Sequence, residues 1–98
     1  MALTQIDDRG LKTPIDLLDN EKIRFGTGND LELFHDGSHS IIKNTTGSLY
    51  AATGAFLVQN AAQTESQIIS SENGSVQLFY DNSKKFHTDS AGAVMGGR

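Results

Sequence analysis

A chain of 98 residues has room for one small domain at most, and its net charge of −4 is spread without a cluster of either sign. The scattered charge argues against a nucleic-acid-binding protein, which would carry a basic stripe, and no apolar run approaches the ~20 residues that span a bilayer. No cysteine is present, so a disulfide framework and a cysteine-based zinc site are excluded.

Residues 1–18 are predicted to form an N-terminal extension or attachment segment. Met1–Asp8 has acidic residues where a signal peptide would have a basic and then an apolar region, so we expect synthesis in the cytoplasm. Thr13 and Pro14 are residue types that begin helices, but the turn-forming Asp19-Asn20 follows so closely that a helix has little room.

From Asp19 onward, short apolar stretches alternate with turn-forming residues at intervals of about ten residues. Asp36-Gly37 and Asn73-Gly74 have the composition of type I′ hairpin turns, whose two central residues need positive φ. We therefore predict an all-β fold over residues 19–92, followed by a flexible C-terminal stub at residues 93–98. The expected strands are Lys22–Phe25, Leu31–His35, Ser40–Lys43, Ser48–Ala52, Ala55–Gln59, Ser66–Ser70, Ser75–Tyr80 and Lys84–Thr88.

One sequence block occurs twice. LELFHDGS at Leu31–Ser38 returns as VQLFYDNS at Val76–Ser83, 45 residues later, and DNEKIRF at Asp19–Phe25 has a shorter echo in DNSKKF at Asp81–Phe86. Because two β-turn modules are reused in one short chain, the pattern predicts a repetitive β-structure rather than a single-copy catalytic fold.

The apolar content favours an assembly over a free monomer. Leu, Ile, Val and Phe contribute 24 of the 98 residues, barely above the roughly 20% below which chains tend toward disorder. In the stretch Leu31–His35 apolar residues occur at both odd and even positions, so we expect both faces of that strand to be buried. A thin core and two-faced strands together predict that further copies of the chain supply the missing burial.

Three histidines are candidate metal ligands. His35 and His39 straddle the Asp36-Gly37 turn, and three copies of the chain around a threefold axis could place such residues in a ring that holds a transition metal. The favoured interpretation is simpler: His35 is a half-buried strand residue, since Tyr80 is its counterpart in the repeat, and His39 is solvated. His87 adds no ligand motif, and no metal site is predicted.

Asp36-Gly37-Ser38-His39 has the residue types of a hydrolase triad, but adjacency in a turn does not make three groups converge on a substrate. An Asx turn, in which Asp36 and Ser38 bond nearby backbone, is the favoured interpretation. Gly26-Thr27-Gly28 lacks the third glycine and the helix of a dinucleotide site and is expected to be a turn. The acidic loop residues do not have the spacing of a calcium loop; they are Asp30, Asp36, Asp81 and Asp89. No catalytic or cofactor-binding residue is predicted.

Aromatic side chains are candidates for a saccharide or receptor platform, because their rings offer flat apolar area with a polar edge. The residues concerned are Tyr50, Phe56, Tyr80 and Phe86. Core packing is the favoured role for the phenylalanines, while the role of Tyr50 stays open.

DNEKIRFGTGNDLELFHDGSHSII (Asp19–Ile42) and ENGSVQLFYDNSKKFHTDSAG (Glu72–Gly92) resemble the repeats of tail-fibre and other appendage-type structural proteins of marine bacteriophages, especially those of cyanobacteria. The resemblance covers about three quarters of the chain. It implies an elongated, intertwined homotrimer with a β-helix or β-prism architecture. It supplies no catalytic residue and locates no receptor site, and this chain has little more than one cycle where such proteins have many.

We therefore expect a non-enzymatic structural protein of a bacteriophage virion, a trimeric tail-fibre or appendage segment that supports host attachment. The expected partners are further copies of the chain and other tail or virion proteins, with a host surface polysaccharide or receptor as a further candidate and with neither nucleic acid nor membrane insertion. The apolar residues expected to be buried on trimerisation are Leu31, Leu33, Phe34, Leu78, Phe79 and Phe86. The alternatives are a receptor- or glycan-binding module at a fibre tip and, less favoured, an enzyme such as a depolymerase.

Overall fold

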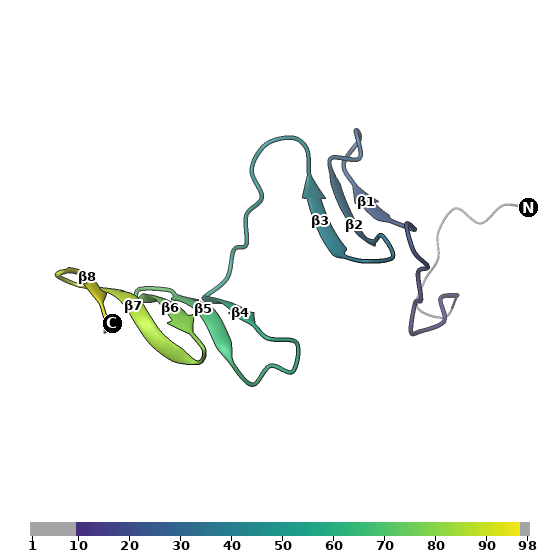
Figure 1. The fold of residues 1–98 in the computed structure, drawn as a ribbon. Helices are drawn as coiled ribbons and strands as arrows, with labels where there is room; N and C mark the ends of the chain where they lie inside the picture. Colours follow the sequence, from purple (N-terminus) through teal and green to yellow (C-terminus); the bar gives the residue numbers. More distant parts are fainter. Residues whose placement is uncertain (1–9, 97–98) are drawn as a thin grey trace, which may run out of the picture. The chain divides into compact units, whose positions relative to one another are not determined.

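The computed structural model describes residues 10–96, and within that range the chain is all-β, with two antiparallel sheets and no helix (Figure 1). The predicted all-β fold is confirmed. The strands are β1 (Ile23–Phe25), β2 (Leu31–His35), β3 (Ser40–Asn44), β4 (Ala55–Gln59), β5 (Ser66–Ser71), β6 (Val76–Tyr80), β7 (Ser83–Asp89) and β8 (Gly92–Met95). Two compact units divide between Leu49 and Tyr50, and each contains one sheet. The single module expected at residues 19–92 is thus two units.

The first unit contains a three-stranded meander, β1-β2-β3. Its N-terminal side is fixed by a turn rather than a helix: the amide of Glu21 donates to the carbonyl of Leu18 at 3.0 Å, and the amide of Asn20 donates to the carbonyl of His35 at 2.7 Å. The peptide bond between Thr13 and Pro14 is cis. The helix-start signals in this segment therefore do not lead to a helix, because the chain turns before one could propagate.

The second unit contains a five-stranded meander, β4-β5-β6-β7-β8. The β6–β7 hairpin has the two-residue loop Asp81-Asn82, with φ of 49° and 64°, as a type I′ turn requires. The β2–β3 hairpin has a longer loop, Asp36–His39, in which Gly37 takes the positive φ of 100°. The Asp-Gly pair was therefore correctly predicted as a hairpin, but not as a two-residue type I′ turn.

The C-terminal stub expected at residues 93–98 is partly wrong. Ala93–Met95 belong to β8, which pairs with β7 through four antiparallel partners. Asp89 makes this possible, because its Oδ1 accepts the amide of Ala91 at 2.9 Å and so closes the turn between the two strands. Residues 97–98, and residues 1–9 of the expected N-terminal extension, lie outside the described range.

The sequence repeat is also a structural repeat. Ile23 pairs with Leu33, Arg24 with Glu32 and Phe25 with Leu31; adding 45 to each number gives the pairs between β5 and β6. The turn hydrogen bond from the amide of Asn29 to the carbonyl of Gly26 likewise recurs between Gly74 and Ser71, at 3.1 Å in both copies. In sequence, residues 23–50 align with residues 68–95 at the constant offset of 45. The shared register ends at the hairpins, because Leu33 pairs with Ile42 whereas Leu78 pairs with Phe86, one residue earlier than that offset would give.

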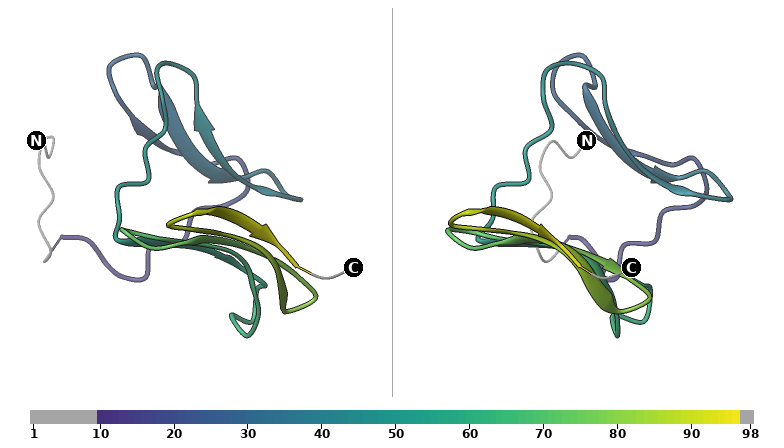
Figure 2. Two further views of the ribbon diagram at one scale, coloured as in Figure 1. Left: turned by 90° about the vertical axis from the view of Figure 1, so that its left-hand side faces the viewer. Right: turned by 60° about the vertical axis from the view of Figure 1, so that its left-hand side comes forward.

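Each sheet is a single layer made of strands that are neighbours in sequence (Figure 2). In antiparallel pairs, partner residues point to the same face of the sheet, so the register assigns every strand residue to one of two faces. No helix in the described range is available to cross a membrane.

Candidate assembly interface

One face of the first sheet is apolar and uncovered. Ile23, Leu33 and Ile42 are partners across the three strands and form a row, and Phe25 and Leu31 form a second apolar pair beside them. Leu31 and Leu33 are half-buried, whereas Ile42 is 65% exposed. We call this set the first apolar face. Its lack of charge makes it suited to contact another apolar surface.

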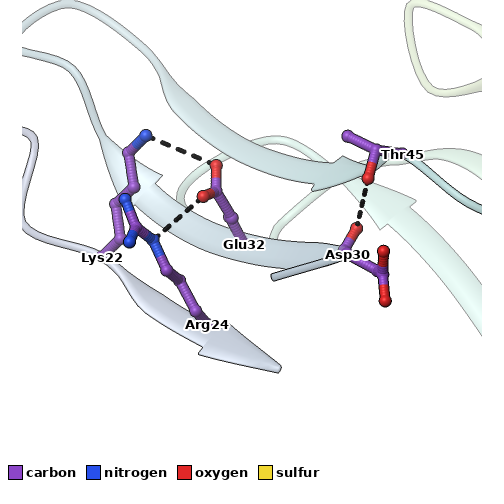
Figure 3. A network of polar contacts seen from close by, with 5 residues as sticks. All are labelled: Lys22, Arg24, Asp30, Glu32 and Thr45. Carbon is purple, nitrogen blue, oxygen red and sulfur yellow. Dashed lines mark hydrogen bonds and ion pairs between the residues drawn. The ribbon is translucent and has the colours of Figure 1, made fainter. Parts of the chain in front are cut away.

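The opposite face of the same sheet is charged. Arg24, Glu32 and Lys43 are partners across the strands, and the Glu32 carboxylate forms ion pairs with Arg24 at 3.0 Å and Lys22 at 3.4 Å (Figure 3). The Lys22 ammonium lies 4.6 Å from the centroid of the Phe34 ring and covers it. On this face, charged side chains therefore already cover the one large aromatic residue, Phe34.

Both faces of the strand Leu31–His35 were expected to be buried, and within the chain the two faces differ in character. The predicted alternation of side chains is confirmed, since Leu31, Leu33 and His35 share one face of the sheet and Glu32 and Phe34 share the other. What the sequence pattern omitted is that neighbouring strands place charges around Phe34. Phe34 accordingly does not belong to the first apolar face.

The second sheet also has one strongly apolar face. A row of partners crosses all five strands, and it consists of Val58, Ile68, Leu78, Phe86 and Met95. Phe56 and Val76 lie on the same face, and we call the seven residues together the second apolar face. The row on the opposite face is mixed and contains Leu57, Ile69, Gln77, His87 and Val94. Phe79 lies on this mixed face, opposite Lys84.

The two apolar faces are equivalent in the repeat. Leu31 and Leu33 of the first face correspond to Val76 and Leu78 of the second, whereas Glu32 and Phe34 correspond to Gln77 and Phe79 on the polar and mixed faces. Six residues were expected to be buried on trimerisation. Of these, Leu31 and Leu33 lie on the first apolar face, and Leu78 and Phe86 lie on the second. Phe34 and Phe79 are on the opposite faces.

No described side chain is buried within the chain, and seventeen large apolar residues of the described part are exposed. The signal in the sequence for this lack of burial is the low content of large apolar residues.

The histidines belong to both units: His35 and His39 lie in the first and His87 in the second. His35 Nδ1 lies 3.0 Å from the hydroxyl oxygen of Ser40, its partner across the β2–β3 hairpin. His87 is half-buried on the mixed face and lines a shallow hollow with Asp89 and Ser75. Among residues 10–96, no group of three His, Cys, Asp or Glu side chains is placed to hold a metal ion.

Asp36 forms the predicted Asx turn. Its Oδ1 accepts the amide of His39 at 2.7 Å and that of Ser38 at 2.9 Å. These two amides, with that of His39 having the larger effect, hold the pKa of the Asp36 carboxyl below its ordinary value, because they stabilise the charged form. Asp36 thus contacts the backbone of His39 and not its ring, so the three triad-type residues are not arranged as a triad.

The remaining candidates are turns or separate surface residues. The amide of Asn29 closes the turn at Gly26–Gly28, as expected, and Asp30 binds Thr45 and Thr46. Tyr50 and Tyr80 are highly exposed, but Tyr80 is in the β6 strand while Tyr50 is outside any strand. No protein-family model matches this chain, and no curated protein and no solved structure matches it.

Proposed function

We propose that this chain is a non-enzymatic structural module that assembles with further copies of itself into a β-structured homotrimer. One observation carries the proposal: both sheets present an uncovered apolar face, and no described side chain is buried. Since apolar burial is the main favourable term in folding, such a chain gains its stability when the first and second apolar faces are covered.

A second copy is the partner that this argument favours. The two apolar faces are repeats of one pattern, so a surface that fits one of them is present in every copy of the chain. Three copies, a β-helix or β-prism arrangement and a place in the tail fibre or appendage of a bacteriophage virion are what the resemblance implies. We adopt them as part of the proposal, with host attachment as the process that the assembly supports.

Absolute mass in solution tests the assembly. Light scattering on micromolar protein should give a mass near three times the 10.6 kDa of the chain. A folded protein of single-chain mass would overturn the proposal. The same measurement with a chelator tests the histidine ring, because loss of the trimer on chelation would require a metal at the threefold axis, whereas we expect no change.

The virion role needs a separate measurement. Peptides of this chain should be found by mass spectrometry in purified particles of the phage that encodes it, at a copy number that is a multiple of three. Their absence from intact particles would remove the virion part of the proposal while leaving the assembly untouched.

A further inference from the structure

The two units differ at the outer edge of their third strand. In the second unit that edge of β7 is paired with β8. In the first unit β3 pairs with β2 on one side, and no described strand pairs with its other edge. The residues that correspond to β8 by the 45-residue repeat are Gly47–Tyr50, which form no strand (Figure 1).

This unpaired segment has the character of a strand without a partner. Ser48, Leu49 and Tyr50 correspond to Ala93, Val94 and Met95 of β8. The Leu49 side chain is 58% exposed and that of Tyr50 is 86% exposed. The first unit therefore has an open strand edge at β3, and the unpaired apolar segment Ser48–Tyr50 spans the boundary between the two units. The edge lacks a partner strand, and the segment lacks a strand to pair with.

A local clasp explains why the segment does not fold back on its own β3. The hydroxyl of Thr45 donates to the carbonyl of Asp30 at 3.3 Å (Figure 3), and the amide of Thr45 donates to the same oxygen at 2.8 Å. The Thr46 hydroxyl donates to the Asp30 carboxylate at 3.1 Å. These bonds prolong the β2–β3 pairing by one residue past Asn44, where a hairpin would have to turn.

The second unit lacks the side-chain pair of this clasp but keeps its backbone groups, since the carbonyl of Ser75 and the amide and hydroxyl of Ser90 stand at the positions of Asp30 and Thr45. Ser75 stands in the place of Asp30, and Ala91, which has no hydroxyl, stands in the place of Thr46. There the Asp89 carboxylate accepts the amide of Ala91 instead, and the chain reverses into β8. The same sequence pattern is thus a hairpin in one unit and an outgoing segment in the other.

We propose that Ser48–Tyr50 of one copy adds as an antiparallel strand to the open edge of β3 in a second copy. Subtracting 45 from the β7–β8 register places Leu49 opposite Ile42 and Ser48 opposite Lys43. Leu49 then extends the row Ile23–Leu33–Ile42 of the first apolar face onto a fourth strand. The added strand pairs the free backbone groups of β3 and covers an exposed apolar side chain in one step.

This inference rests on the proposed self-assembly and names the contact that links the copies. Each chain both donates a segment and accepts one, so every copy in a closed ring has its β3 edge covered. The clasp at Asp30 favours exchange between chains, because it holds Thr45 and Thr46 at the end of β2, where a hairpin within one chain would have to turn.

Engineered disulfides test the contact directly, since the natural chain contains no cysteine. In the variant K43C/S48C, the two introduced residues are predicted to be cross-strand partners, whose Cα atoms lie about 4.5–5.5 Å apart and within reach of a disulfide. Under mild oxidation we expect most of the protein to run at two or three times the chain mass on a non-reducing gel. The variant T88C/A93C, at the corresponding β7–β8 positions, is the matched control and should form its disulfide within one chain.

The outcomes separate this inference from the proposed function. A trimer by light scattering in which K43C/S48C forms no disulfide between chains overturns the strand exchange and leaves the assembly standing. A disulfide within one chain overturns it as well, because Ser48 would then pair with its own β3. A monomer with free thiols overturns both proposals.

A second variant tests the clasp. D30S/N44D/T46A gives the first unit the corresponding residues of the second. Combined with K43C/S48C, it should shift the disulfide from between chains to within one chain. The reason is that the first unit can then form the hairpin that the second unit forms between β7 and β8. Disulfides that stay between chains at an unchanged fraction would show that the clasp does not direct the segment.

Discussion

At several corners of this chain, an Asp or Asn side chain is hydrogen-bonded to backbone a few residues away. Besides Asp36 and Asp89, Asn60 accepts the amides of Thr64 and Glu65, both at 2.9 Å, and Asn44 donates to the carbonyl of Gly47 at 3.0 Å. Such bonds are formed within a turn and need no core around them. Local polar contacts therefore define the corners of a chain that buries none of its described side chains.

Asp36 should make stability depend on pH. Because its pKa is lowered in the folded state, its contribution is present above the ordinary value of 3.8 and is lost as the pH falls through the folded-state pKa. Asp36→Asn keeps an acceptor oxygen but no charge, so we expect a lower Tm than the natural chain at pH 7 and an equal Tm at about pH 2. Thermal unfolding followed by circular dichroism at both pH values measures the two differences.

The control for this prediction is Asp81→Asn, at the corresponding position of the two-residue turn, where Asn is well tolerated at positive φ. A Tm difference between the natural chain and Asp36→Asn that is the same at both pH values would contradict the assigned role of the charge.

Gly37 has a φ of 100°, which an L side chain rarely adopts. A Cβ there would meet only the Asp19 carboxylate at 3.5 Å, an ordinary contact, so the cost of Gly37→Ala is conformational and amounts to about 1 kcal/mol. Gly54→Ala is the control, because Gly54 is outside the left-handed region and should tolerate the change with at most a small gain in stability. Urea unfolding of both variants checks the difference, and equal free energies of unfolding would contradict it.

Two segments at corresponding positions of the repeat differ from their predicted secondary structure in opposite ways. Ser48–Ala52 was predicted as a strand and forms none, whereas Ala93–Met95 was predicted as part of a stub and belongs to β8. Apolar alternation cannot separate the two, because Leu49 and Val94 occupy the same position in the pattern. What does differ is the hydrogen bonding at the preceding corner, where Asp30 holds Thr45 in one unit and Asp89 holds Ala91 in the other.

The two faces of the second sheet should differ in their effect on assembly. Leu78 on the second apolar face and Leu57 on the mixed face are 40% and 44% exposed, which makes them a matched pair. Burying a leucine contributes about 1.5–3 kcal/mol, so Leu78→Asn should raise the dissociation constant of the assembly by at least about tenfold. Leu57→Asn should change it little.

Sedimentation velocity over a dilution series measures both constants. Equal effects of the two substitutions would show that both faces of the second sheet are covered in the assembly, and a larger effect of Leu57→Asn would reverse the assignment of the interface.

For the molecule as a whole, the lack of buried side chains is the feature that matters. None of the described side chains is buried, and each sheet is a single layer. A single layer satisfies backbone hydrogen bonds between strands, but it leaves both faces to be covered by something else. Stability and association should therefore be one process.

This coupling predicts that Tm depends on protein concentration. If folded chains are stable only in the assembly, raising the concentration over about a hundredfold range should raise Tm by several degrees, since association stabilises the folded state by mass action. Differential scanning calorimetry across the range measures the trend. A constant Tm would mean that each chain is stable alone.

The sequence by itself determined the local structure of this protein. The strands Leu31–His35 and Ala55–Gln59 have the predicted bounds, and most of the others differ by one residue at either end, because alternation and turn residues act over a few neighbours. The repeat likewise predicted equivalent strands, and the structure extends it backward to the pairs that Ile23–Phe25 and Ile68–Ser70 form with the repeated blocks.

Only the tertiary structure decided which face of each strand is apolar across a whole sheet. Phe34 and Leu33 are both large apolar residues in one strand, yet Lys22 covers Phe34 while Leu33 joins an uncovered row with Ile23 and Ile42. The partners that make this difference come from other strands, at sequence distances that no local pattern specifies. For the same reason the clasp between Asp30 and Thr45, fifteen residues apart, could not be predicted from the residues that it holds.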